Sequence, residues 1–117
     1  MNDLISDIYD EIDVMVNIAQ EYLSYLIGDQ TEEDMYEEIE DCVRHSYITD
    51  AVDVVDYMHN AIQEDGRHDD ILDGIFDFNG MMGYFDDEEI EENMYNEALN
   101  YFNEAKNRTL DEFAKYI

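Results

Sequence analysis

The chain has 117 residues, with 33 Asp and Glu against 5 Lys and Arg, so its formal net charge is -28 at pH 7. Because 45% of the residues are hydrophobic and 13% are aromatic, the composition predicts a folded single domain over residues 1–117 and not a disordered polyanion. A surface with this much negative charge is repelled by nucleic acid and by anionic lipid, and it attracts proteins with basic surfaces. We therefore expect neither a nucleic acid nor a membrane among its partners.

Two further features of the composition predict where the protein acts. Cys42 is the only cysteine, which excludes an internal disulfide and suits a reducing compartment. The sequence lacks a basic N-terminal region followed by an apolar run, and it lacks an apolar stretch of about 18 residues that would span a membrane. The expected location is the cytoplasm.

Apolar residues recur at spacings of three and four over residues 2–27, which is typical of an amphipathic helix. Gly28 is expected to end this helix as a C-cap. Thr31 is a predicted N-cap, because its hydroxyl can accept a hydrogen bond from an early backbone amide and acidic residues follow it. The second helix is expected to reach about residue 46 and to bury Met35, Ile39, Cys42 and Val43.

The second half of the chain continues this helical pattern. Thr49 is expected to cap a third helix that ends near Gly66 and turns Val52, Val55, Met58 and Ile62 inward. A short helix or turn is expected over 70–78, followed by a loose segment at 79–83 and a long helix from about 90 to 107. The capping box Thr109-Leu110-Asp111-Glu112 predicts the start of a last helix. The sequence thus predicts an all-α domain of five to six amphipathic helices with an acidic outer surface.

Nearly all positions opposite the apolar stripes carry carboxylates. An ordinary helix would pair such acids with Lys or Arg three or four residues away, gaining about 0.2–0.5 kcal/mol per pair. Residues 1–43 instead contain 14 acids and no Lys or Arg. The carboxylates that we expect to face outward and contact a partner are Asp3, Asp7, Asp10, Glu11, Glu33, Glu37, Glu40, Asp41, Asp50, Asp53, Asp56, Glu88, Glu89, Glu91, Glu92 and Glu97.

The charge density of the chain is comparable with that of duplex DNA. Duplex DNA carries one charge per ~1.7 Å of axis, so 28 charges correspond to about 48 Å of duplex, or on the order of 14 base pairs. Helical carboxylates at i and i+4 lie about 6 Å apart along the axis, so several helices can hold rows of fixed anions. We therefore interpret the chain as a DNA-mimic inhibitor that occupies the DNA-binding cleft of another protein, and we expect it to form an elongated homodimer.

One part of the chain resembles a known family. The acidic run at 31–39, the polar segment 44–47 and the second acidic amphipathic run at 50–58 are similar to the central part of the Ocr family of phage anti-restriction proteins and, more distantly, to the ArdA proteins. This resemblance implies an all-helical acidic dimer that imitates bent B-form DNA and blocks type I restriction-modification enzymes of the host. A phage or mobile element would then encode the protein.

Other functions are compatible with an acidic helical chain. An acidic helical adaptor, or an inhibitor of a CRISPR effector, nucleoid protein or toxin that binds through a local patch without imitating DNA, is the main alternative. A metal centre has little support, because the Asp56-x-x-His59 spacing occurs once and no EF-hand loop is present. Since no nucleophile-base constellation or phosphate-binding glycine loop accompanies the acids, we expect no enzyme activity and no cofactor.

Overall fold

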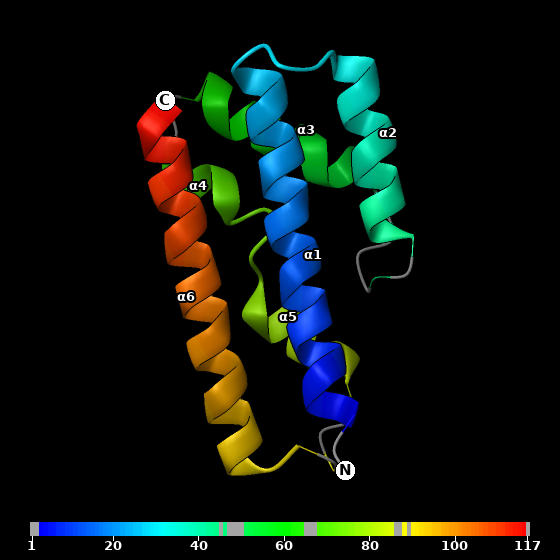
Figure 1. Cartoon of the computed structure of the whole chain (residues 1–117), viewed down its shortest axis with the longest axis vertical. Helices are drawn as coiled ribbons and strands as arrows, with labels where there is room; N and C mark the ends of the chain where they lie inside the picture. The colour runs from blue at the N-terminus through cyan, green and yellow to red at the C-terminus, as the bar shows by residue number, and fades with distance from the viewer. Residues whose placement is uncertain are drawn as a thin grey trace.

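The two longest helices, α1 (Asp3–Leu26) and α6 (Glu92–Tyr116), lie side by side (Figure 1). The computed structural model describes residues 3–44, 46, 51–64, 68–85, 88 and 90–116. For residues 3, 68 and 69 it describes the backbone alone. α2 (Glu32–Val43) packs against α1, α3 (Ala51–Gln63) packs against α2 and α4 (His68–Leu72), and α4 packs against α6. A seven-residue helix, α5 (Phe78–Tyr84), completes the set.

This architecture confirms the prediction of an all-helical fold of five to six helices, because the described residues form six helices and no strand. The helices make one globule whose principal extents are 43 × 25 × 21 Å. The molecule is therefore elongated along the direction of α1 and α6 (Figure 1).

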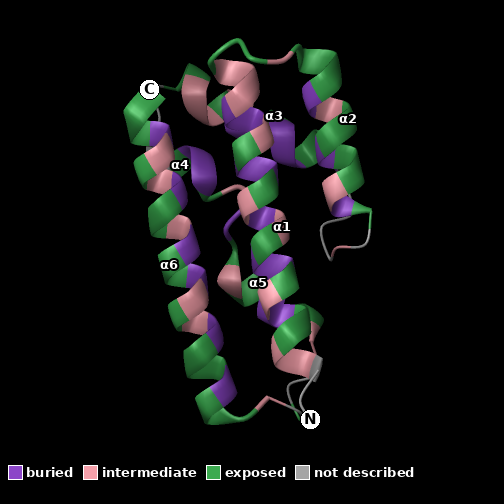
Figure 2. Cartoon of the chain, in the orientation of Figure 1, coloured by how far each residue is buried: buried purple, intermediate pink, exposed green. Residues whose placement is uncertain are grey.

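The core forms where the apolar stripes of the helices meet. The stripe of α1 is buried as its spacing predicts, with Ile8, Ile12 and Met15 at 0% exposure, and buried positions follow one side of α1 and of α6 (Figure 2). Gly28 closes α1 with φ +85°, the left-handed conformation that favours glycine. Thr31 begins α2 as predicted, since its Oγ1 accepts a 3.1 Å hydrogen bond from the backbone N–H of Asp34.

The inward face of α3 differs from the prediction. Val52 was expected to be buried but is 48% exposed, whereas Ala51, Val54, Val55 and Met58 are buried. The buried stripe begins one residue earlier than expected, and Val52 then lies about 100° around the helix from Ala51. Ile62 and Cys42 are only partly buried against the core. The predicted cap at 49 and the predicted helix end at 66 fall outside the described residues.

The segment predicted to be loose is instead α5. Asp77 caps this helix, because its Oδ1 accepts a 3.0 Å hydrogen bond from the backbone N–H of Gly80. Met81 and Met82 are buried in the core. Two glycines lower the helix propensity of this segment, and the cap and the burial of the methionines offset that cost.

The predicted helix start at Thr109 is also wrong, because α6 runs through it without a break. Thr109 is 3% exposed, and its Oγ1 donates a 2.8 Å hydrogen bond to the carbonyl oxygen of Ala105 in the preceding turn. The buried positions Phe102, Ala105, Thr109 and Phe113 continue one apolar stripe at spacings of three and four. A new helix that started at Thr109 would interrupt that stripe.

Candidate functional site

The densest group of carboxylates lies on α2. Seven of its 12 residues are Asp or Glu, and every one of these side chains is exposed. Burial of Met35, Ile39 and Val43 fixes one side of the helix on the core, so the opposite side faces solvent. The exposed acids are Glu32, Glu33, Asp34, Glu37, Glu38, Glu40 and Asp41, which include all four α2 residues predicted from the sequence.

Few cations lie near these acids. Arg44 Nη2 lies 3.0 Å from Asp41 Oδ1, but both side chains are more than 60% exposed, so the pair contributes about 0–1 kcal/mol. The carboxylates of Glu33, Glu37 and Glu40 form no ion pair with a described cation. The outer face of α2 is therefore almost purely anionic.

The other described cations lie on α6. Lys106 Nζ lies 3.0 Å from Asp73 Oδ1, and Lys115 Nζ lies 3.2 Å from Glu112 Oε1. Arg108 is on the same helix and is exposed. Apart from Arg44 at the end of α2, the described cations thus lie on a different helix from the one where the chain concentrates its acids.

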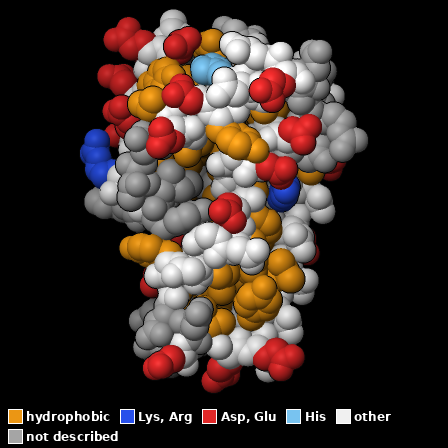
Figure 3. All heavy atoms as spheres, turned by 180° about the vertical axis from the view of Figure 1, so that it is seen from behind, with side chains coloured by type: hydrophobic (Ala, Val, Ile, Leu, Met, Phe, Trp, Pro, Cys, Tyr) orange, Lys and Arg blue, Asp and Glu red, His pale blue; other side chains and the backbone are white. Residues whose placement is uncertain are grey.

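Most of the remaining predicted carboxylates also face solvent where the structure describes them. Asp50 and Glu89 fall outside the described residues, and Asp3 lies in α1 with its side chain outside them. Those that are exposed are Asp7 and Asp10 on α1, Asp53 and Asp56 on α3, and Glu88, Glu91, Glu92 and Glu97 in or just before α6. Figure 3 shows acidic side chains spread over the face opposite to that of Figure 1, with hydrophobic patches between them.

Glu11 does not belong to the outward-facing carboxylates. It is 8% exposed, and Ser46 Oγ donates a 2.9 Å hydrogen bond to its Oε2. The position lies three residues after Ile8 and four before Met15, so it belongs to the inward stripe of α1. The expectation that Glu11 faces outward is therefore wrong, and the spacing could have revealed this.

Asp13 is an exposed carboxylate that the predicted set lacks. Tyr101 Oη donates a 2.6 Å hydrogen bond to its Oδ1, and the Tyr101 ring stacks on Tyr9 with centroids 4.3 Å apart. This hydrogen bond, together with partial burial, raises the pKa of Tyr101 above its ordinary value. Since 88 residues separate the two side chains, nothing in the local sequence pattern indicates their contact.

A second aromatic cluster joins α1 to α3. Tyr22 Oη lies 2.8 Å from His59 Nδ1, and the ring of Tyr25 packs edge-on to His59. Burial raises the pKa of Tyr22 far above its ordinary value, with smaller contributions from the nearby acids and phenols. His59 thus packs in an interhelical aromatic cluster. Within the described part of the chain, no group of three or more His, Cys, Asp or Glu side chains could hold a metal ion.

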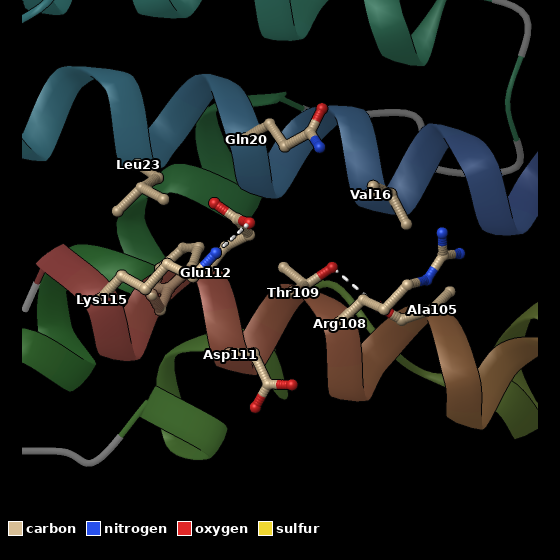
Figure 4. Close-up of a pocket in the computed structure, with 10 residues that line it drawn as sticks. Val16, Gln20, Leu23, Ala105, Arg108, Thr109, Asp111, Glu112 and Lys115 are labelled. Carbon is tan, nitrogen blue, oxygen red and sulfur yellow. Dashed lines mark hydrogen bonds and ion pairs between the residues drawn. The ribbon is translucent and has the colours of Figure 1, made fainter.

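A pocket of about 340 Å³ lies between the C-terminal halves of α1 and α6 (Figure 4). Val16, Leu23, Ala105 and Phe113 contribute apolar surface to it. In its polar lining, the Thr109 hydroxyl donates to the carbonyl oxygen of Ala105 and Lys115 pairs with Glu112. The pocket lies between two helices, and its lining carries charges of both signs.

No family model, curated protein or solved structure matches this chain. Among the described helices, none has the length and apolar character needed to cross a bilayer. Inferences about function therefore depend on the charge and geometry of the exposed side chains.

Proposed function

We propose that the protein is a DNA-mimic inhibitor that competes for the DNA-binding cleft of a host defence protein. The observation that carries this proposal is the outer face of α2, where Glu33, Glu37 and Glu40 are exposed and form no ion pair with a described cation. Like charges at i and i+4 destabilise a helix by about 0.2–0.5 kcal/mol per pair. A face that bears this cost without compensation suits a basic partner better than it suits solvent.

The dimensions of the molecule support the same function. A duplex as long as the 43 Å axis of the molecule would carry about 25 phosphate charges, and the chain carries a net charge of -28. The acids sit on helices that pack on a shared core, so the backbone positions that carry them are fixed before binding. Preorganisation of this kind lowers the entropy that a partner must remove on association.

The mechanism follows from the chemistry of basic clefts. Lys and Arg side chains that normally contact phosphates would contact carboxylates of the inhibitor, and counterions would leave both surfaces. Complementary charge also steers association and raises its rate. Binding of the inhibitor and binding of DNA would then exclude each other.

The first candidate target is a type I restriction-modification enzyme, which the sequence resemblance to anti-restriction proteins suggests. A CRISPR effector or a nucleoid protein presents a similar basic cleft and is the next candidate. In this proposal the protein is phage-encoded, acts in the host cytoplasm, and extends its acidic surface by forming a homodimer. It needs neither a cofactor nor a catalytic residue.

A second candidate function, an adaptor that binds one basic protein through a local patch, has one observation in its favour. Val52 and Tyr57 on α3 are each 48% exposed. Apolar and aromatic side chains in such positions contribute contact area at protein interfaces. The adaptor would depend on such exposed apolar side chains, whereas the mimic would depend on many dispersed carboxylates.

The two candidates are separated by charge-neutral substitution. Glu33→Gln, Glu37→Gln and Glu40→Gln, introduced one at a time and then together, remove charge from α2, and Val52→Ser removes an exposed apolar side chain from α3. The readout is inhibition of DNA cleavage by a type I restriction-modification enzyme. The mimic predicts a graded loss as α2 charges are removed. Abolition by Val52→Ser, with no effect of the α2 changes, would establish the adaptor instead.

A further inference from the structure

A pocket of about 420 Å³ lies beside the C-terminal end of α3, away from α2. Its lining comes from the last turns of α3, from the residue that follows α3 and from α4, and it consists of Tyr57, Asn60, Ala61, Glu64 and Asp70. The pocket thus has an aromatic ring, a small alanine, an amide and two carboxylates, and no described cation lines it. This combination of groups suits a cationic ligand.

The aromatic side of the pocket is held in place by the backbone. The Tyr57 ring lies directly against Gly74, where a Cβ atom would lie 2.8 Å from Cγ and 2.9 Å from Cε1 of the ring. Real Cβ atoms do not approach other atoms so closely, so only glycine lets the ring take this position. Tyr57 is nevertheless 48% exposed. The glycine therefore supports a tyrosine whose ring remains accessible.

Three electrostatic features favour a positive charge at this place. The C-terminal end of a helix carries about half a negative charge, and α3 has no basic residue in its last turn. The exposed Glu64 follows the end of α3 and forms no ion pair with a described cation. The face of a tyrosine ring also attracts cations through its quadrupole.

We propose that this pocket binds an arginine side chain of a protein partner. A guanidinium can stack on the Tyr57 ring and donate hydrogen bonds to Glu64 at the same time, whereas the ammonium group of lysine is a strongly hydrated point charge that does not stack. This inference rests on the proposed DNA-mimic function, which supplies the identity of the partner. It adds a contact that a phosphate backbone cannot offer, so arginine-rich clefts would hold the inhibitor more tightly than charge alone explains.

The test uses oligoarginine and oligolysine of equal length as probes, so that their charges are matched. Affinities are measured by calorimetry on the full chain for the wild type, Tyr57→Leu, Tyr57→Phe and Glu64→Gln. Tyr116→Leu is the matched control, because Tyr116 at the C-terminal end of α6 is also an exposed tyrosine, 58% exposed, and does not line the pocket. Thermal melts establish that each variant is folded.

Tyr57→Leu is expected to weaken the binding of oligoarginine by about two- to fivefold, the ratio that loss of an exposed cation-π contact gives, and to weaken the binding of oligolysine less, so the wild type prefers oligoarginine. Tyr57→Leu removes this preference, whereas Tyr57→Phe and Tyr116→Leu retain it. Glu64→Gln weakens the binding of both peptides and reduces the salt dependence. Equal affinity of the wild type for the two peptides, or an equal loss in Tyr57→Leu and Tyr116→Leu, would overturn the proposal.

The same variants separate this pocket from the proposed function. If the wild type prefers arginine through Tyr57 but does not inhibit DNA cleavage by a restriction-modification enzyme, the proposed function fails and the arginine pocket stands. If the wild type inhibits cleavage but shows no arginine preference, the pocket fails and the mimic stands.

Discussion

Tyr101 on α6 donates a 2.6 Å hydrogen bond to Asp13 on α1, so an exposed carboxylate is fixed to a helix distant in the sequence. The contact joins the two longest helices and stacks Tyr101 on Tyr9. The hydrogen bond restricts the rotamers of the Asp13 side chain. The relationship illustrates how the fold can preorganise anions on its surface.

Tyr101→Phe tests this contact, because it removes only the hydroxyl. We expect the free energy of unfolding to fall by about 0.5–1.5 kcal/mol, as for the loss of one hydrogen bond. Urea denaturation measures the change. Tyr95→Phe is the matched control, since Tyr95 packs edge-on against Phe78 and its hydroxyl has no hydrogen bond within the described chain. Equal effects of the two changes would show that the Asp13 contact is not stabilising.

Gly74→Ala tests the close packing of Tyr57 on the backbone. The added methyl group must displace the ring, so we expect a loss of about 1–3 kcal/mol, typical of overpacking. Gly83→Ala in α5 is the control, because nothing lies within 4 Å of a Cβ at that position. This second change should be neutral or stabilise by about 0.4–1 kcal/mol. Comparable melting temperatures for the two variants would contradict the packing described at Gly74.

The tyrosines predict a loss of stability in alkali. Burial is the largest cause that raises the pKa of Tyr22, Tyr25 and Tyr36, and the hydrogen bond to Asp13 is the largest for Tyr101. In the unfolded chain these phenols lose protons near pH 10, while the folded state still holds them. Their contribution is therefore fully present below about pH 10 and is lost as the pH rises through the raised folded values.

Urea denaturation between about pH 8 and pH 12 measures this effect on the free energy of unfolding. Tyr36→Phe should make the decline with pH less steep, because it removes one of the shifted groups. A free energy of unfolding that stays constant through this range would show that the phenols titrate alike in the folded and unfolded chains.

Self-repulsion among the acids predicts that salt stabilises the fold. The Debye length falls from ~30 Å at 0.01 M to ~3 Å at 1 M, so added sodium chloride screens the repulsion between carboxylates on α2. The melting temperature should therefore rise with salt. The rise should be smaller in the combined variant Glu33→Gln, Glu37→Gln and Glu40→Gln. A melting temperature that falls on addition of salt to a low-salt buffer would contradict this account.

Much of the fold could be predicted because helical periodicity is strong in this chain. The stripe of α1, the glycine that ends it and the Thr31 cap are all local signals, and all are confirmed. Thr31 and Thr109 both precede acidic residues three positions later, yet only Thr31 is a cap. Thr109 lies within a buried stripe that continues past it, so tertiary packing decides against the local signal.

The candidate site could be predicted only in part. The outward position of the α2 acids follows from the spacing of Met35 and Ile39, and the same rule applied to Glu11 would have placed it inward. The contact between Asp13 and Tyr101 depends on how α1 and α6 pack, and no local pattern contains that information. The pocket at Tyr57 likewise depends on where Gly74 lies in the fold.

Competition on a purified type I restriction-modification enzyme tests the central claim most directly. Labelled duplex DNA is bound to the enzyme, the protein is titrated in, and the DNA that remains bound is measured over a range of salt concentrations. The account predicts complete displacement, an apparent affinity that weakens as DNA concentration rises, and a steep linear fall of log affinity with log salt. A ternary complex of enzyme, DNA and protein, or an affinity that does not depend on salt, would contradict it.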